Sequence, residues 1–168
     1  MDLALVTGRG PDLLTNLGGL KPLVQDCDVV AFGFRDDLDG YGELAAESSH
    51  PAFQWVSLVD VRRVGASSAA RDAIAHLRSS VIHGLWIHLD VDVLDDVLMP
   101  AVDSRQPGGL SYEELRAVLN TVLDSGLAVG LEITILDPEL DTDGRITREF
   151  AGFLADTLST GIVTRRPA

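Results

Sequence analysis

Apolar runs of strand length alternate with runs of helical periodicity along this chain, and this order constrains the fold more than any other feature. The strand-like runs lie at 26–34, 53–58, 84–91 and 127–136. The helical runs lie at 67–80, 111–126 and 147–159. Strands that are apolar almost throughout and are separated by helices form parallel sheets covered on both faces. The sequence therefore predicts a three-layer α/β/α fold with a mostly parallel sheet.

The run at 111–126 carries the clearest boundary signals. Ser111 followed by Glu114 forms a capping box, and Gly126 marks the end of the helix. The long loops at 36–52 and 93–110 follow the carboxyl ends of predicted strands, where open parallel sheets bind ligands. We expect functional residues in these loops.

Length and composition restrict the classes of protein that the chain can belong to. Its 168 residues predict a single domain over 1–168. A net charge of −13 argues against nucleic acid or an anionic membrane surface as a partner. No apolar run approaches the roughly 18 residues of a membrane span, and the first residues lack the basic region of a signal peptide. The lone Cys27 is expected to be a buried core thiol, which fits a cytoplasmic location.

The segment "HLDVDVLDD" (88–96) raises a chemical problem. Strand alternation points Asp90 and Asp92 the same way, and the apolar run before them predicts burial on both faces. Two carboxylates so placed need a shared proton, a basic partner or a multivalent cation. No Lys or Arg lies between Arg78 and Arg105, so Mn²⁺ or Mg²⁺ is the most economical partner. The alternative is a solvated crevice in which Asp95 and Asp96 cap the loop.

Residues 88–115, "HLDVDVLDDVLMPAVDSRQPGGLSYEEL", add a more specific signal. They resemble the third signature of the arginase–agmatinase–formiminoglutamase (ureohydrolase) family, a strand ending in D-x-D-x-x-D-P followed by P-A and G-G-L. The residues at matching spacing are Asp90, Asp92, Asp95, Pro100, Ala101, Gly108, Gly109 and Leu110. The departures are His88, where Ser or Thr is usual, Asp96 in place of Pro, and Arg105 where Pro is common.

Other segments extend this resemblance over nearly the whole chain. "MDLALVTGRGP" is similar to the helix after an H-G pair in the family, "AFGFRDDLD" to the strand ending G-L-R-D, and "LEITILDPELD" to the last strand. Together they correspond only to the carboxyl-terminal half of the family's fold. The resemblance therefore implies an arginase-like domain truncated at the amino terminus.

The resemblance also implies a chemistry. Members of the family bind two Mn²⁺ ions and hydrolyse a C–N bond of a linear amidine or guanidine. By resemblance, Asp90 and Asp92 are metal ligands and Asp36, beside Asp37, contacts the substrate amine. A loop-capping Asx turn is an equal alternative for Asp36 and Asp37. The family's G-G-D-H and D-A-H-x-D segments and its catalytic His have no counterpart in this sequence, so no catalytic residue is assigned.

Two further positions bear on specificity and support of the site. Guanidine-hydrolysing members carry a Glu where this chain has Ile135, and Glu132 is expected to point to the other face. Ile135 cannot form a bidentate salt bridge with a guanidinium. His88 is interpreted either as a hydrogen-bond partner of a ligand carboxylate or, by about two to one, as a satisfied core histidine.

Two readings of the function stay open at this point. The first is a manganese-dependent ureohydrolase of the arginase or agmatinase type. The second is an inactive arginase-like remnant or a truncated product that acts, if at all, as a partner-binding subunit. Loss of the strand that flanks 27–34 in the family leaves an unpaired apolar edge, which predicts association between copies, including a homo-oligomer.

Overall fold

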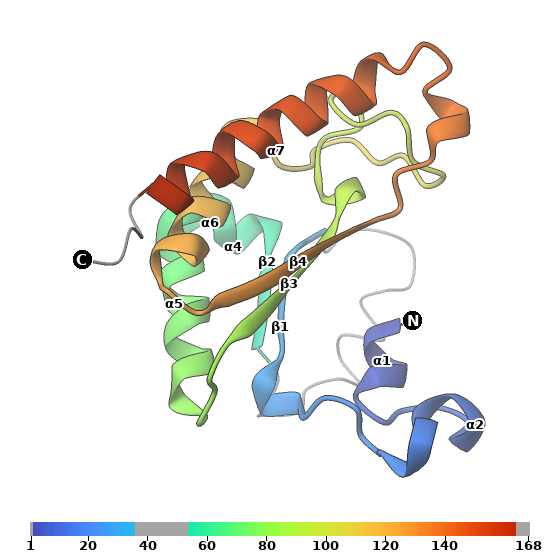
Figure 1. Ribbon diagram of the computed structural model, residues 1–168, viewed down its shortest axis with the longest axis vertical. Helices are drawn as coiled ribbons and strands as arrows, with labels where there is room; N and C mark the ends of the chain where they lie inside the picture. Colours follow the sequence, from blue (N-terminus) through green and yellow to red (C-terminus); the bar gives the residue numbers. More distant parts are fainter. Residues whose placement is uncertain (1, 36–53, 164–168) are drawn as a thin grey trace.

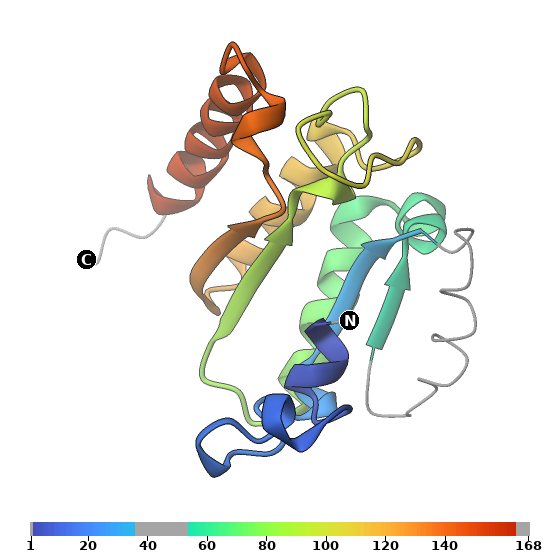
Figure 2. The ribbon, with the colours of Figure 1, turned by 90° about the vertical axis from the view of Figure 1, so that its right-hand side faces the viewer.

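The computed structural model describes residues 2–35 and 54–163, and the strands in these ranges are all parallel to their partners. The strands are β1 (Val30–Phe34), β2 (Gln54–Ser57), β3 (Leu85–Asp90) and β4 (Ala128–Thr134). They form two separate pairs, β1 with β2 and β3 with β4. Figure 2 shows the arrows pointing the same way, in the spatial order β4, β3, β1, β2. The predicted parallel arrangement is confirmed.

Helices lie on both sides of the strands, but the two helical layers are unequal (Figure 1). The long layer consists of α4 (Leu58–Val64), α5 (Ala66–Ser79), α6 (Tyr112–Asp124) and α7 (Arg145–Val163). The short layer consists of α1 (Asp2–Val6) and α2 (Asp12–Thr15), with the 3₁₀ turn η1 (Leu17–Gly19). Within the described ranges, every helix is too short or too polar to cross a lipid bilayer. The three-layer α/β/α fold is confirmed.

Local sequence signals explain where the helices begin. Ser111 accepts a hydrogen bond from the Glu114 backbone N–H (3.1 Å), and the Glu114 carboxylate accepts one from the Ser111 N–H (2.8 Å), so the predicted capping box is present. The sequence analysis missed α4, which starts directly at the end of β2. There Ser57 accepts a hydrogen bond from the Asp60 N–H (3.1 Å) and acts as the N-cap.

The hydrophobic core lies between the strands and the long helical layer. Leu89, Leu94 and Leu110 from β3 and the following loop pack there with Leu119 of α6 and Phe150 of α7. These side chains are all at most 5% exposed. The core therefore ties β3 firmly to the helices on one side.

The opposite face of β3 is open, so the prediction of burial on both faces is wrong. Trp86 is 61% exposed, and the His88 side chain is 56% exposed. The physical reason is the unequal layers, because α4–α7 all cover the other face. Gly130 on β4 gives the Trp86 ring room to lie against the strand, since a Cβ at that position would collide with the ring.

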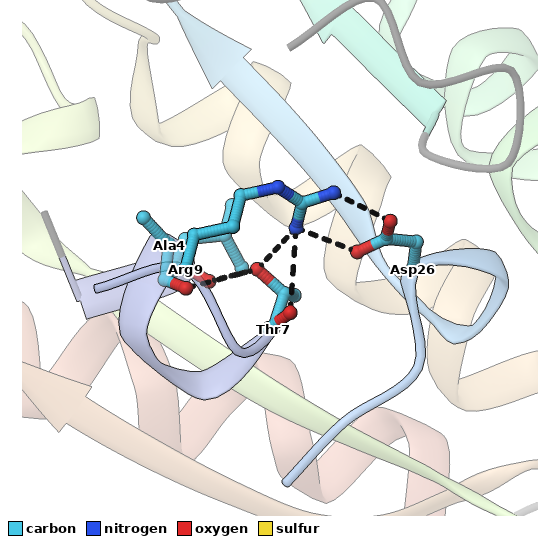
Figure 3. A network of polar contacts seen from close by, with 5 residues as sticks. Ala4, Thr7, Arg9 and Asp26 are labelled. Atoms are coloured by element: carbon cyan, nitrogen blue, oxygen red, sulfur yellow. Dashed lines mark hydrogen bonds and ion pairs between the residues drawn. The ribbon is translucent and has the colours of Figure 1, made fainter. Parts of the chain in front are cut away.

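The N-terminal segment (residues 2–29) is held mainly by polar contacts. Arg9 makes a bidentate ion pair with Asp26 (2.8 and 2.6 Å) and also donates to the Thr7 hydroxyl (2.7 Å), as Figure 3 shows. This contact joins the end of α1 to the 3₁₀ turn η2 (Asp26–Asp28) that precedes β1. Cys27 lies in that turn and is exposed, so the prediction of a buried thiol is wrong because the strand starts later than the apolar run.

Candidate functional site

Asp90 and Asp92 come together at the carboxyl end of β3. Asp90 is the last residue of the strand, and Asp92 lies in the 3₁₀ turn η3 (Val91–Val93) that follows. The Asp90 carboxylate accepts a hydrogen bond from the Asp92 backbone N–H (3.4 Å) and caps the turn. Both side chains are partly buried. The structure thus brings together the two residues that the sequence singled out.

The two carboxylates of Asp90 and Asp92 repel each other, as the sequence implies. Burial, followed by the charge of Asp90 and a hydrogen bond to it, raises the pKa of the Asp92 carboxyl to about 6. Asp103, from the same loop, raises this pKa further, while Arg35 lowers it. Near neutral pH, burial and the negative charge of Asp90 therefore destabilise the ionised form of Asp92, and a nearby cation would relieve this repulsion.

Arg35 is the basic partner that the sequence analysis missed. Its guanidinium donates to the backbone carbonyls of Asp92 (2.8 Å) and Leu94 (2.9 Å), which fixes the turn after β3 against the end of β1. Its Nε is buried without a hydrogen-bond partner among the described residues. The signal was available, because Arg35 directly follows a strand whose carboxyl end meets that of β3 at the same edge.

The loop after η3 is ordered by the acidic residues that follow the pair. Asp95 accepts hydrogen bonds from the N–H groups of Val97 (3.1 Å) and Gly108 (2.7 Å), and these bonds lower the pKa of its carboxyl. Asp96 forms an ion pair with Arg105 (3.2 Å). Asp95 thus caps the loop as expected, whereas Asp96 pairs with a side chain, and Asp90 caps the short 3₁₀ turn η3.

His88 lies on the open face of β3 and contacts β4. Its Nδ1 lies 2.7 Å from the Glu132 carboxylate, and its Nε2 lies 3.4 Å from the Thr134 hydroxyl. The interpretation as a core histidine is wrong, because the side chain is more than half exposed. In the described residues its hydrogen bonds go to β4 rather than to Asp90.

Ile135 directly follows β4 in a strained backbone conformation. Its φ of 71° is in the left-handed region, which a β-branched residue rarely adopts. Asp137, two residues further on, donates its N–H to the Ala101 carbonyl (2.9 Å), so the segment is tied to the loop after β3. The Ile135 side chain is 43% exposed. The structure thus places an apolar side chain, rather than a carboxylate, at the end of β4.

Asp90 and Asp92 do not by themselves make a metal site. Asp90 and Asp92 offer hard oxygen ligands that suit Mn²⁺. Within residues 2–35 and 54–163, however, no group of three or more His, Cys, Asp or Glu side chains is placed to hold a metal ion. Asp36, the predicted substrate contact, and Asp37 lie outside the described residues. A complete site therefore needs ligands from elsewhere.

A shallow depression at the start of α5 and α6 is a separate feature. It is lined by Gly65, Ala66, Ser67, Ser68, Glu113, Glu114 and Ala117, none of which belongs to the segment around Asp90. It is open to solvent and lacks converging ligand groups, so the chemistry of the pair makes the end of β3 the better candidate site.

Sequence comparisons connect these features with known proteins. The model of the Arginase family matches residues 19–159. An arginase from Brevibacillus brevis is 31% identical over 148 residues, which cover 88% of this chain and 48% of that protein. An arginase from Agrobacterium fabrum is 37% identical over 95 residues, 55% of this chain and 29% of that protein.

Solved structures give the same result at the level of the fold. A crystal structure of the arginase from Bacillus subtilis matches with a TM-score of 0.79 and 25% identity, covering 100% of this chain and 54% of that one. The arginase from Bacillus caldovelox matches with a TM-score of 0.73 and 28% identity, covering 83% and 46%. The sequence printed above thus spans about half the length of these relatives.

Proposed function

Since this chain belongs to the arginase family, we propose that it supplies metal ligands to a manganese-dependent hydrolase that cleaves a C–N bond of a linear amidine or guanidine. Asp90 and Asp92 are the proposed ligands, and Asp36 is the proposed contact to the substrate amine. The proposal rests on the pair of half-buried carboxylates at the end of β3. Among the described residues, the Asp92 carboxylate does not cap a helix or a turn.

The surroundings of the pair support a cation at this place. Burial and like charge raise the pKa of the Asp92 carboxyl to about 6, so a divalent ion would relieve an existing repulsion. Arg35 is held on the backbone carbonyls of Asp92 and Leu94, which positions the turn and leaves the carboxylates available. When bound, manganese would supply the Lewis acidity that activates water at neutral pH.

The remaining ligands must come from outside the described residues. Two carboxylates alone do not hold a metal ion in a defined geometry. We therefore assign to this chain a share of the ligands and the positioning of the turn, and no proton-transfer step. Ile135 at the end of β4 cannot pair with a guanidinium, so the proposal stays at the level of the substrate class.

A titration with Mn²⁺, followed by calorimetry, tests the ligand assignment on the chain itself. Binding should weaken at least about tenfold in Asp90→Ala, because a charged ligand contributes more than about 1.4 kcal/mol. The matched control is Asp96→Ala, which removes a carboxylate of the same loop that is paired with Arg105 and should leave Mn²⁺ binding unchanged.

Equal loss of Mn²⁺ binding in both variants would contradict the ligand assignment and favour a non-catalytic arginase-like remnant. Hydrolysis of arginine, agmatine and formiminoglutamate, measured as release of urea or ammonia in the presence of Mn²⁺, then tests the substrate class.

A further inference from the structure

The four backbone carbonyls that follow β3 are held by two different kinds of donor. Backbone N–H groups donate to the carbonyls of Val91 (3.2 Å) and Val93 (2.8 Å). The Arg35 guanidinium donates to the other two, those of Asp92 (2.8 Å) and Leu94 (2.9 Å), and both bonds come from Nη2. In the described residues, Arg35 therefore completes the hydrogen bonding of a turn that backbone bonds satisfy only in part.

Both backbone polar groups of Asp92 are held by side chains. The Asp92 N–H donates to the Asp90 carboxylate (3.4 Å), and the Asp92 carbonyl accepts from Arg35. Rotation of either peptide group next to the Asp92 Cα breaks one of these bonds, so the direction of its Cα–Cβ bond is fixed relative to β3. A residue outside the turn thus helps to set where the Asp92 side chain starts from.

The Arg35 guanidinium lies in a narrow slot at the edge of the sheet where β1 and β3 both end (Figure 2). A Cβ on Gly109 would collide with Nη2 and with the Leu94 backbone, so the guanidinium lies directly against the Gly109 backbone. Its Nη1 lies 3.4 Å from the Gln106 side-chain oxygen. The slot therefore confines the guanidinium to the position from which it reaches both carbonyls.

The charge of Arg35 and its hydrogen bonds have opposite consequences for a cation at the pair. Arg35 lies close enough to Asp92 to lower the pKa of that carboxyl, so its positive charge would also repel a divalent cation bound there. Charge alone therefore predicts that loss of Arg35 strengthens cation binding. A role through the turn predicts that the same loss weakens it.

We propose that Arg35 is a positioning residue for the candidate site, and that its hold on the carbonyls of Asp92 and Leu94 fixes the direction in which the Asp92 carboxylate points. The pair thereby offers a divalent cation a defined geometry. Groups that orient metal ligands typically change metal affinity by about 10–100-fold when they are replaced. The consequence for the cation rests on the proposed function, whereas the orientation of Asp92 does not.

Two substitutions at Arg35 separate shape from charge. Arg35→Lys keeps the charge, but its ammonium ends about one C–N bond, roughly 1.3 Å, short of the position of Nη2. Arg35→Met removes both the charge and the donors and keeps an unbranched stem. The matched control is Arg62→Met, because Arg62 also donates to a carbonyl of this loop, that of Gly109 (2.9 Å), but from α4 and outside the turn. Thermal unfolding measures the loss of stability in each variant.

The orientation of Asp92 is measured by NMR on the metal-free 168-residue chain. Three-bond couplings from the backbone N and carbonyl C to the Asp92 Cγ report the χ1 rotamer. One staggered rotamer is expected in the unmodified chain and in Arg62→Met, and an average over rotamers in both Arg35 variants. A loss of stability alone does not change the rotamer of a chain that stays folded. The same single rotamer in Arg35→Met would overturn the proposal.

A titration with Mn²⁺ at pH 8, above the pKa of the Asp92 carboxyl, tests the consequence for the cation. Paramagnetic broadening of the amide signals of 90–94 detects even weak binding. Both Arg35 variants should bind at least about tenfold more weakly, and Arg62→Met should bind like the unmodified chain. Tighter binding by Arg35→Met, unchanged binding by Arg35→Lys, or an equal loss in Arg62→Met would overturn the proposal.

The proposed function and this inference can fail separately. Broadening that Asp90→Ala and Asp96→Ala alter equally would reject the ligand assignment, and the rotamer of Asp92, which needs no metal, would then decide the role of Arg35. A loss of binding in Asp90→Ala alone, together with unaltered Arg35 variants, would keep the ligand assignment and reject the positioning role.

Discussion

The loop after β3 (residues 91–110) and the N-terminal segment are both short of regular structure, yet they are ordered in different ways. The loop buries most of its apolar side chains, with Leu94 and Met99 at most 1% exposed and Val97 as an exposed exception, and Asp95 caps its backbone. The N-terminal segment exposes its leucines and is held by the ion pairs of Arg9 and Lys21. The loop is therefore stabilised by contacts within this chain, whereas the N-terminal segment exposes apolar side chains that another polypeptide could cover.

The largest expected contrast between the two regions concerns leucine truncation. Leu94→Ala should lower the free energy of unfolding by about 2–5 kcal/mol, because it opens a cavity in the core. Leu13→Ala should change it by less than about 0.5 kcal/mol, because Leu13 is 84% exposed. Urea denaturation of both variants measures the difference. Similar losses would mean that the N-terminal segment is packed as tightly as the loop.

A pair of neighbouring glycines tests how closely the loop is packed. A Cβ at Gly109 would collide with the Arg35 guanidinium and the Leu94 backbone, so Gly109→Ala should destabilise the chain by about 2–3 kcal/mol. Gly108 has a φ of 82° and open space around it, so Gly108→Ala should cost only about 1 kcal/mol of backbone strain. Thermal unfolding separates them, and a reversed order would show that Arg35 can move aside freely.

Removal of the Arg9 side chain probes the N-terminal segment. Arg9→Ala should destabilise the segment by about 1 kcal/mol, because the bidentate pair with Asp26 is partly exposed. The effect should appear as faster amide exchange in residues 2–29, with exchange in the loop unchanged. Lys21→Ala is the control, since the Asp12 partner of Lys21 is 78% exposed and the loss should be smaller.

The smallest expected effect is a pH dependence of the loop. The hydrogen bonds from Val97 and Gly108 lower the pKa of the Asp95 carboxyl. Its stabilising contribution is therefore complete above the ordinary carboxyl pKa of about 3.9 and is lost as the pH falls through the lowered folded value. The Tm of Asp95→Asn should fall less steeply on acidification below pH 4 than that of the unmodified chain. Parallel curves would contradict this role.

The sequence predicted those features that depend on local patterns. The period of the apolar residues located the strands and the three predicted helices, and Ser111 with Glu114 marked the start of α6. The spacing also located Asp90 and Asp92 at one strand end, but the expectation that strand alternation orients both is wrong, because β3 stops at Asp90 and a 3₁₀ turn holds Asp92. These features need only neighbours within a few residues, so a single sequence contains the information.

The features that sequence reasoning missed depend on distant parts of the chain. The burial of β3 on one face depends on where α4–α7 pack, and Cys27 is exposed because a 3₁₀ turn delays the start of β1. Arg35 reaches Asp92 across 57 positions of sequence, and its place at a strand end indicates the edge where it lies but not which carbonyl it contacts. Metal, substrate and oligomeric state remain predictions, and the predicted contact at Asp36 lies outside the described residues.

The left-handed backbone at Ile135 has a consequence for how this chain tolerates mutation. A non-glycine residue held at such a φ retains a strain of about 1–3 kcal/mol, and a β-branched side chain is among the least suited to it. Because the side chain is 43% exposed, little packing would be lost on replacement. Replacement of Ile135 by Gly or Asn should therefore stabilise the chain. The end of β4 thus accepts these two residues without a penalty to the fold.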